Sequence, residues 1–317
     1  MKREKRVLQF IVNWLAGTPS FAAPYALAAL GLIIGERAGV LSLGAEGFML
    51  VGALAGVAAD LEFGGYPAVS LAVAMLAAAM VSLLFALLVV VLRVNQVIAG
   101  LAIVFFCQGL TSLVGTLAGW TNRAIGGLHE VAIWPLSDIP VVGRILFTQN
   151  LVVYLTIPIF FAVNNILSRS MLGLRLRSVG ENPEAADAVG VSVPAYRFGA
   201  VVAGSALIGL AGGYLSVVDV KIWIPDMTGG RGWIAIALVI FARWQPWRAL
   251  FGALLFGCIE ALIPRIAAAG IQLPQYFLLM TPYLATIAVM IWAGLSKFGR
   301  SNEPAALGQP HVREERR

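Results

Sequence analysis

Charged residues are scarce in this chain. Only 12% of its 317 residues are Asp, Glu, Lys or Arg, whereas a soluble domain has about 25%. Hydrophobic residues make up 60%, and the mean hydropathy is +0.87. So few charges cannot cover a water-facing surface, and the apolar runs extend over the whole length. The sequence therefore predicts an all-α integral membrane protein without a separate soluble domain.

Cysteine and histidine are scarcer still, with two of each. Cys107 and Cys258 lie in apolar segments, where we expect packing residues and no disulfide framework. His129 and His311 lie in different loops without the spacing of metal ligands, so no metal site is expected. The net charge of +6 is assigned to loops beside a lipid bilayer, and no nucleic-acid partner is expected.

The sequence also lacks an ATP-binding motif and any recognisable set of catalytic residues. The chain has no Gly-x-x-x-x-Gly-Lys-[Ser/Thr], so we expect it to bind no ATP in the P-loop manner. The apolar segments carry no combination of nucleophile, base and metal ligands. We therefore expect neither an enzyme nor a bound cofactor.

Apolar segments long enough to be considered as membrane spans are numerous, since a span needs about 20 apolar residues. The candidates are Ser20–Gly35, Gly39–Ala59, Pro67–Leu92, Gln96–Ala118, Asn150–Leu167, Tyr196–Val218, Gly232–Ala242, Arg248–Pro264 and Tyr276–Gly294. Gly232–Ala242 is too short to cross alone. Gly39–Ala59 contains Gly44, Glu46 and Gly47, so we expect it to break or bend. This pattern predicts eight or nine transmembrane helices with a broken second segment.

Basic residues set the expected orientation, because Lys and Arg accumulate in cytoplasmic loops. They place the loop at 168–195 and the C-terminus in the cytoplasm. Counting back from Arg37 puts the N-terminus outside, although it reads KREKR. Either the first segment does not cross fully, or this end departs from the rule. We divide the chain into an N-terminal interfacial segment (1–19), a transmembrane domain (20–296) that includes the cytoplasmic loop at 168–195, and a cytoplasmic tail (297–317).

Two stretches resemble one another inside the chain. GAEGFMLVGALAGVA begins at Gly44, and GGRGWIAIALVIFA begins at Gly229. Each precedes a span that begins with proline, at Pro67 and at Pro246, and the expected topology runs them in opposite directions. This pattern is typical of an inverted repeat, which places a substrate path near the midplane. Chance similarity between Gly- and Ala-rich helices is the alternative.

Polar groups within the spans are candidates for the path, because ionisable residues there are costly. Glu46 either lines the path or is structural, capping a broken helix or pairing with Arg37. Glu260 is expected to pair with Arg265. The loop from Trp223 to Trp233 is expected to form the outer mouth. The predicted path residues are Glu46, Gln96, Gln108, Trp233 and Glu260.

One polar helix interrupts the apolar sequence, in GENPEAADAVG from Gly180 to Gly190. Asn182 is a good N-cap, Pro183 suits the first helical position and Gly190 is a natural stop. The sequence predicts a helix over about Pro183–Val189. Two turns are too short to be stable alone, and a surface of small residues favours docking against a partner. An ordinary capped loop helix is the alternative.

The same stretch resembles the cytoplasmic coupling segment of ABC-importer permeases for branched-chain amino acids, ribose and nucleosides. Their Gly-x-Asn-x-x-Ala-Ala-x-x-x-Gly pattern is matched by Gly180, Asn182, Ala185, Ala186 and Gly190. GERAGVLSLGAEGFMLVGALAG (35–56) is similar to the signature of nucleoside and simple-sugar permeases, although Leu-Ser-Leu at 41–43 departs from it. PAALGQP (304–310) resembles the tail of these permeases.

The resemblance implies a permease subunit of an ABC importer in a bacterial inner membrane. A separate ATPase would use the ATP and contact this chain at Gly180, Glu181, Asn182, Pro183, Ala185, Ala186 and Gly190. A second permease subunit and an extracytoplasmic solute-binding protein would complete the importer. The implied cargo is a nucleoside, with a simple sugar second. The alternative is an ion-coupled secondary transporter or channel, in which Glu46 and Glu260 would couple the ion.

Overall fold

The computed structural model describes residues 2–139, 141–268, 280–281, 283–284, 287–288, 291 and 303–311, with side chains from Gln9 onward. The helices in this part are α1 (Lys2–Arg37), α2 (Ala45–Glu62), α3 (Pro67–Ala86), α4 (Gln96–Leu117), α5 (Val142–Leu146), α6 (Leu151–Arg169), α7 (Met171–Glu181), α8 (Pro183–Ala188), α9 (Val193–Gly213), α10 (Arg231–Ala242) and α11 (Pro246–Ala268). The predicted all-α fold is confirmed.

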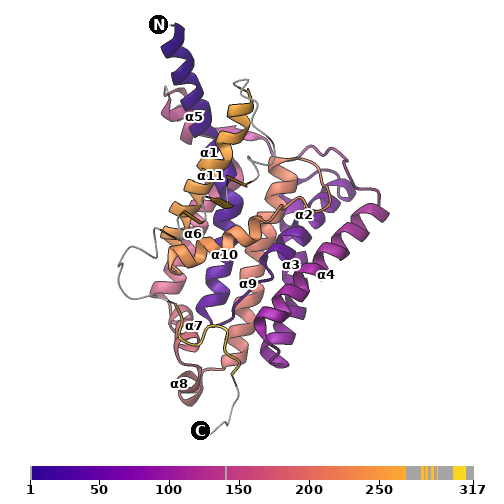
Figure 1. Cartoon of the computed structure of the whole chain (residues 1–317), viewed down its shortest axis with the longest axis vertical. Helices are drawn as coiled ribbons and strands as arrows, with labels where there is room; N and C mark the ends of the chain where they lie inside the picture. The colour runs from indigo at the N-terminus through magenta and orange to yellow at the C-terminus, as the bar shows by residue number, and fades with distance from the viewer. Residues whose placement is uncertain are drawn as a thin grey trace.

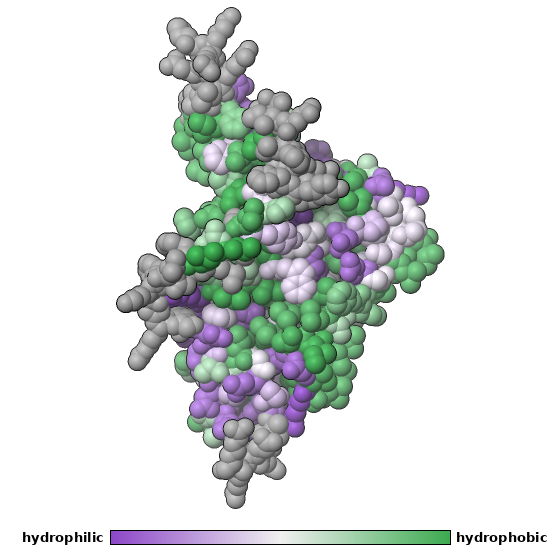
Figure 2. Space-filling model, viewed as in Figure 1, coloured by the Kyte–Doolittle hydropathy of each residue, from purple (hydrophilic) through white to green (hydrophobic). Residues whose placement is uncertain are grey.

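Six helical segments of the described chain are long and apolar enough to cross a membrane. They are Gln9–Arg37, Pro67–Val91, Gln96–Leu117, Leu151–Arg169, Val193–Asp219 and Pro246–Ala268. Two of them end in π-helical turns, η1 (Leu87–Val91) and η3 (Tyr214–Asp219). The ninth candidate, Tyr276–Gly294, lies mostly outside the described residues. Apolar residues cover the side formed by α3 and α4, and hydrophilic residues gather around α7 and α8 (Figure 2).

Helix α1 contains the first apolar segment and the residues that precede it. It has 36 residues, which makes it about 54 Å long. It runs from the N-terminal end of the molecule to the opposite end, where α7, α8 and residues 303–311 lie (Figure 1). The first segment therefore passes through the whole molecule, and no break separates residues 2–19 from the rest of the helix. That these first turns lie at a membrane surface stays a prediction.

The core is built around the crossing of α1 and α9. A Cβ atom added to Gly31 would lie 2.3 Å from the carbonyl oxygen of Gly204, and one added to Gly204 would lie 2.3 Å from that of Gly31. Small residues at both positions let the two backbones touch. Around this crossing, α2 and α3 both pack on α9. In the same way, α10 and α11 both pack on α1. This arrangement has the pattern of the predicted inverted repeat, with α1–α3 matching α9–α11.

The predicted break in the second segment is confirmed. Residues 38–44 are not helical, and α2 begins only at Ala45. The backbone N–H of Leu41 donates to Gln96 Oε1 at 2.7 Å, which satisfies one donor of this irregular stretch. Helix α10 is short, as predicted, and its 12 residues reach at most about 18 Å.

The loops at the N-terminal end carry short ordered elements. Strand β1 (Glu130–Ala132) pairs antiparallel with β2 (Thr148–Asn150), with a 3-10 turn η2 (Leu136–Asp138) and α5 between them. Asn122 N donates to Trp223 O at 2.9 Å, which joins this loop to residues 220–223. Trp223 is 0% exposed and its ring fills the space beside Gly115 of α4. Trp223 therefore packs against α4, away from solvent, and that its loop forms the outer mouth stays a prediction.

Candidate functional site

Glu46 lies where the two interrupted segments meet. Its Oε1 accepts hydrogen bonds from the Thr228 hydroxyl at 2.5 Å and from Gly230 N at 2.8 Å, and its Oε2 accepts one from Gly232 N at 2.6 Å. The residue is 4% exposed. Gly230 and Gly232 stand at the start of α10, where a helix presents unpaired N–H groups and partial positive charge. Glu46, at the start of α2, therefore caps α10. We call this meeting of the starts of α2 and α10 the junction.

Glycines make this close meeting possible. Gly230 precedes α10 in a left-handed conformation with φ of +84°, which other residues adopt at a cost. A Cβ atom on Gly232 would lie 2.5 Å from Glu46 N and 2.6 Å from Glu46 Cα. The starts of α2 and α10 can therefore touch only because residue 232 has no side chain.

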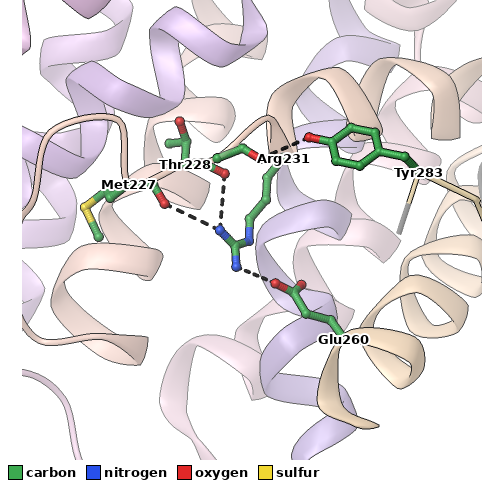
Figure 3. A network of polar contacts seen from close by, with 6 residues as sticks. Met227, Thr228, Arg231, Glu260 and Tyr283 are labelled. Atoms are coloured by element: carbon green, nitrogen blue, oxygen red, sulfur yellow. Dashed lines mark hydrogen bonds and ion pairs between the residues drawn. The ribbon is translucent and has the colours of Figure 1, made fainter. Parts of the chain in front are cut away.

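An ion pair holds the same junction to α11. Arg231 Nη2 pairs with Glu260 Oε1, and Arg231 Nη1 donates to the carbonyl oxygens of Met227 at 3.4 Å and Thr228 at 3.2 Å (Figure 3). The Tyr283 hydroxyl donates to Gly229 O at 3.1 Å. Guanidinium and carboxylate thus neutralise one another in a mostly buried place.

The structure corrects the expected partner of Glu260. The sequence predicts Arg265, five positions later on the same helix. Residues three or four apart are neighbours on a helix surface, but five positions turn the side chain by about 140°. Arg231 reaches Glu260 from α10 instead. The signal that could have suggested it is the Gly-Gly-Arg-Gly sequence at 229–232, which permits close approach.

The other predicted path residues lie in two helices, Trp233 in α10 and both glutamines in α4. Trp233 follows Gly232 at the start of α10 and is half-buried, so it joins Glu46 and Glu260 near the junction. Gln96 is buried at the first position of α4 and holds Leu41 N. Gln108 is half-buried further along α4. Thr228 and Arg231 were missed as junction residues, because the sequence places them in a loop.

A polar cavity opens among five segments toward the N-terminal end. Its volume is 750 Å³, which falls within the range of about 300–1,000 Å³ typical of small-molecule sites. The polar residues that line it are Asn13, Ser20, His129, Glu130, Arg144, Thr148, Gln149, Asn150, Asp219, Lys221, Arg265 and the hydroxyl-bearing Tyr214. The Tyr214 hydroxyl accepts a hydrogen bond from Asn150 Nδ2 at 2.8 Å. Sequence reasoning could not find this cavity, since its walls come from distant segments.

The polar helix forms as predicted at the opposite end of the molecule. Helix α8 spans Pro183–Ala188, and Asn182 Oδ1 accepts a hydrogen bond from Ala185 N at 2.9 Å. Gly190 has φ of +84°. Its N–H donates to Asp187 O at 2.9 Å, and Val191 N donates to Ala186 O at 2.9 Å. This pair of bonds is the Schellman motif that closes a helix at glycine.

The two adjacent alanines of α8 have different environments. Ala186 is 2% exposed and packs with Val179 and Val193. Ala185 is exposed, and Val189 beyond the helix is 80% exposed. Ala185, Ala188 and Val189 are thus the exposed apolar residues of α8 and of the turn that follows it. Ala186 instead holds α8 to its own chain.

The end of α1 lies between α7 and the end of α10, in hydrogen-bonded contact with the latter and in packing contact with the former. Arg37 Nε and Nη2 donate to Trp244 O at 3.2 and 3.0 Å, and Trp244 Nε1 donates to Glu36 Oε2 at 2.5 Å. Trp244 lies two residues beyond the end of α10. A Cβ atom on Gly180 of α7 would lie 2.2 Å from Arg37 O. Arg37 is therefore not the partner of Glu46 but the link between α7 and the end of α10.

No group of three or more His, Cys, Asp or Glu residues in the described part of the chain could hold a metal ion.

Comparison with known proteins identifies the family. Residues 15–297 match the family model described as the branched-chain amino acid transport system, permease component. The chain is 39% identical to a putative glucose ABC transporter permease protein of Haloferax volcanii, over 97% of this chain and 99% of that one. It is 33% identical to the guanosine ABC transporter permease protein of Bacillus subtilis, over 98% and 99%, and 32% identical to a nucleoside ABC transporter permease protein of Lactococcus lactis, over 89% and 92%. The chain is a multi-pass helical membrane protein and belongs to the permease family of the branched-chain amino acid transport system.

Proposed function

We propose that this chain is the transmembrane subunit of an ATP-driven importer for a nucleoside, with a simple sugar as the second choice. A separate ATPase docks on α8, a second permease subunit completes the path, and a solute-binding protein delivers the cargo on the other side. The end that bears α7, α8 and the tail faces the cytoplasm of a bacterial cell. The chain itself catalyses no reaction.

The exposed surface of α8 carries this proposal. A six-residue helix is not stable alone, and here it is capped at both ends and fixed by buried Ala186. Its outward surface carries the small apolar residues Ala185, Ala188 and Val189 beside the carboxylate of Glu184. Such a surface, on a fixed helix at the hydrophilic end of a membrane protein, suits the groove of a soluble partner.

A series of contacts between α7 and Glu46 supports the proposed coupling. Helix α7 touches the end of α1 at Gly180, Arg37 binds the carbonyl group of Trp244, and α10 leads from there to the carboxylate of Glu46. A displacement of α8 would reach the point where α2 and α10 meet through these contacts. The two interrupted segments would then move relative to one another.

An ion-coupled transporter is the weaker candidate. Such a protein needs a carboxylate that can exchange a proton or a sodium ion. Glu46 accepts three hydrogen bonds from fixed donors, and Glu260 is paired with Arg231. Neither has the open surroundings of an exchanging group. The relatives named as permeases of guanosine, nucleosides and glucose favour the ATP-driven importer over the ion-coupled transporter.

Transport by membrane vesicles tests the proposal. Vesicles carrying this chain with the ATPase and the proteins encoded beside it receive labelled nucleosides and sugars. Uptake that needs ATP and persists without ion gradients is expected, and uptake by this chain alone on an ion gradient would overturn the proposal.

Docking is tested separately by Ala185→Glu, which places a charge on the exposed surface of α8. Loss of ATPase from the purified complex is expected. Ala118→Glu is the control, because Ala118 is also exposed and directly follows α4, away from α8. Normal recovery of the ATPase with Ala185→Glu would exclude α8 as the docking helix.

A further inference from the structure

Residues 303–311, here called the C-terminal strap, lie across three distant segments of the chain. Ala306 N donates to Gly180 O at 2.9 Å, and Gly308 N donates to Gly39 O at 3.3 Å. Gly180 belongs to α7, and Gly39 follows the end of α1. The strap therefore joins the helix before α8 to the irregular stretch before α2.

A third attachment reaches the start of α9. Arg197 Nη1 donates to Gln309 O at 2.8 Å, and Arg197 is only 3% exposed. Ala306 is 4% exposed, and Leu307 packs against the main hydrophobic core. The strap is therefore inserted between the other segments and does not lie loosely on their surface.

Glycines leave room for the inserted strap. Gly39 has φ of +86°, and a Cβ atom on it would lie 3.2 Å from Ala306 O and 3.0 Å from Arg197 Nη2. A side chain at residue 39 would therefore press on the strap and on its arginine anchor. The same glycine accepts the hydrogen bond from Gly308. Backbone contact at this place requires the absence of a side chain.

We propose that the C-terminal strap fixes α7 and α8 to the end of α1. A displacement of α8 is then transmitted to α10, because α7 and α8 cannot move independently of α1. This role rests on the proposed function, in which α8 receives the force of the ATPase. Through Gly180, the strap holds the segment that touches Arg37, and Arg37 in turn binds Trp244. Residues Ala306, Gly308 and Arg197 are positioning residues for coupling and make no contact with cargo in this role.

Truncation of the assembled transporter tests the coupling. A chain ending at Asn302 lacks the strap, and a chain ending at His311 keeps it and serves as the control. The ATPase should stay bound to both, whereas uptake per ATP hydrolysed should fall at least about fivefold in the shorter chain, the lower end of usual coupling between sites. Unchanged uptake per ATP would overturn the proposal. Loss of the ATPase together with uptake would also overturn it, since the tail would then belong to the docking surface.

Cysteine labelling tests the position of the strap without transport and without truncation. In a Cys107→Ala/Cys258→Ala background, a water-soluble maleimide should modify Ala306→Cys at least about tenfold more slowly than the exposed Ala118→Cys, because modification of a buried residue requires local opening. Arg197→Met should speed modification of Ala306→Cys. Equal modification rates at the two positions would overturn the inference that the strap is inserted between the other segments. Wild-type uptake that needs no ATP would instead overturn the proposed function and leave the labelling result intact.

Discussion

Glu46→Gln separates the two roles that the sequence allows for this carboxylate. In the structure, Oε1 receives the hydrogen bonds of Thr228 and Gly230, and Oε2 receives that of Gly232. Glutamine has nearly the same shape but only one acceptor oxygen. If that oxygen keeps the two donors at Oε1, the amide NH2 group faces Gly232 N, which stands 2.6 Å from Oε2 in the native protein. Two donors then oppose one another at the start of α10.

The cost follows from the lost interactions. A hydrogen bond to a charged group contributes about 1.5–3 kcal/mol to stability. The favourable interaction of a partly buried charge with the start of a helix contributes up to about 2 kcal/mol. We therefore expect Glu46→Gln to lower the free energy of unfolding by roughly 3 kcal/mol, and transport to be lost together with stability.

Thermal unfolding of the purified protein in detergent measures the change. Thr228→Val removes one donor to Oε1 and should cost about 1.5 kcal/mol alone. In the double variant the two losses should be non-additive by at least about 0.5 kcal/mol, because both changes act on the same contact. A Glu46→Gln protein that is as stable as the wild type but changed in transport would refute capping and restore the path-lining role.

Three further changes test the junction and α8. Gly232→Ala should destabilise the protein by about 1–3 kcal/mol in the same unfolding assay, because its Cβ atom meets the backbone of α2; Gly199→Ala, which faces open space, is the control, and equal effects would contradict the close contact. Arg231→Met should cost roughly 3 kcal/mol by leaving Glu260 unpaired, and adding Glu260→Met should recover most of it; no recovery would argue against the pair. Asn182→Ala should weaken α8 by about 1 kcal/mol and lower the affinity for the ATPase in a binding titration, whereas Asn182→Asp should preserve it.

Local sequence predicted the parts of the candidate site that depend on neighbouring residues. The cap at Asn182, the stop at Gly190 and the irregular stretch before Ala45 were all predicted correctly. Each is set within a few residues by backbone conformation and nearby hydrogen bonds. The shortness of α10 was equally visible, since an apolar run of its length cannot span a membrane.

Partners across the fold could not be predicted in the same way. Arg265 was the expected partner of Glu260 because it is near in sequence, whereas Arg231 reaches it from another helix. Ala185 and Ala186 are adjacent residues of the same type, so the sequence does not distinguish them. Only packing against Val179 and Val193 shows that Ala186 is the buried one. Trp223 lies in a loop that the sequence predicts to be at the outer mouth, and its burial beside Gly115 was not visible from the sequence.

The sequence by itself determined that this protein is a helical membrane protein, where its second segment breaks and where a capped helix stands at its hydrophilic end. Those features follow from composition, from the length of apolar runs and from local backbone preferences. Only the tertiary structure decided that Glu46 caps α10, that Arg231 pairs with Glu260 and that the strap joins Gly39 to Gly180. These contacts join residues 29 to 269 positions apart, and side-chain packing between helices selects them from many sequence-compatible pairs.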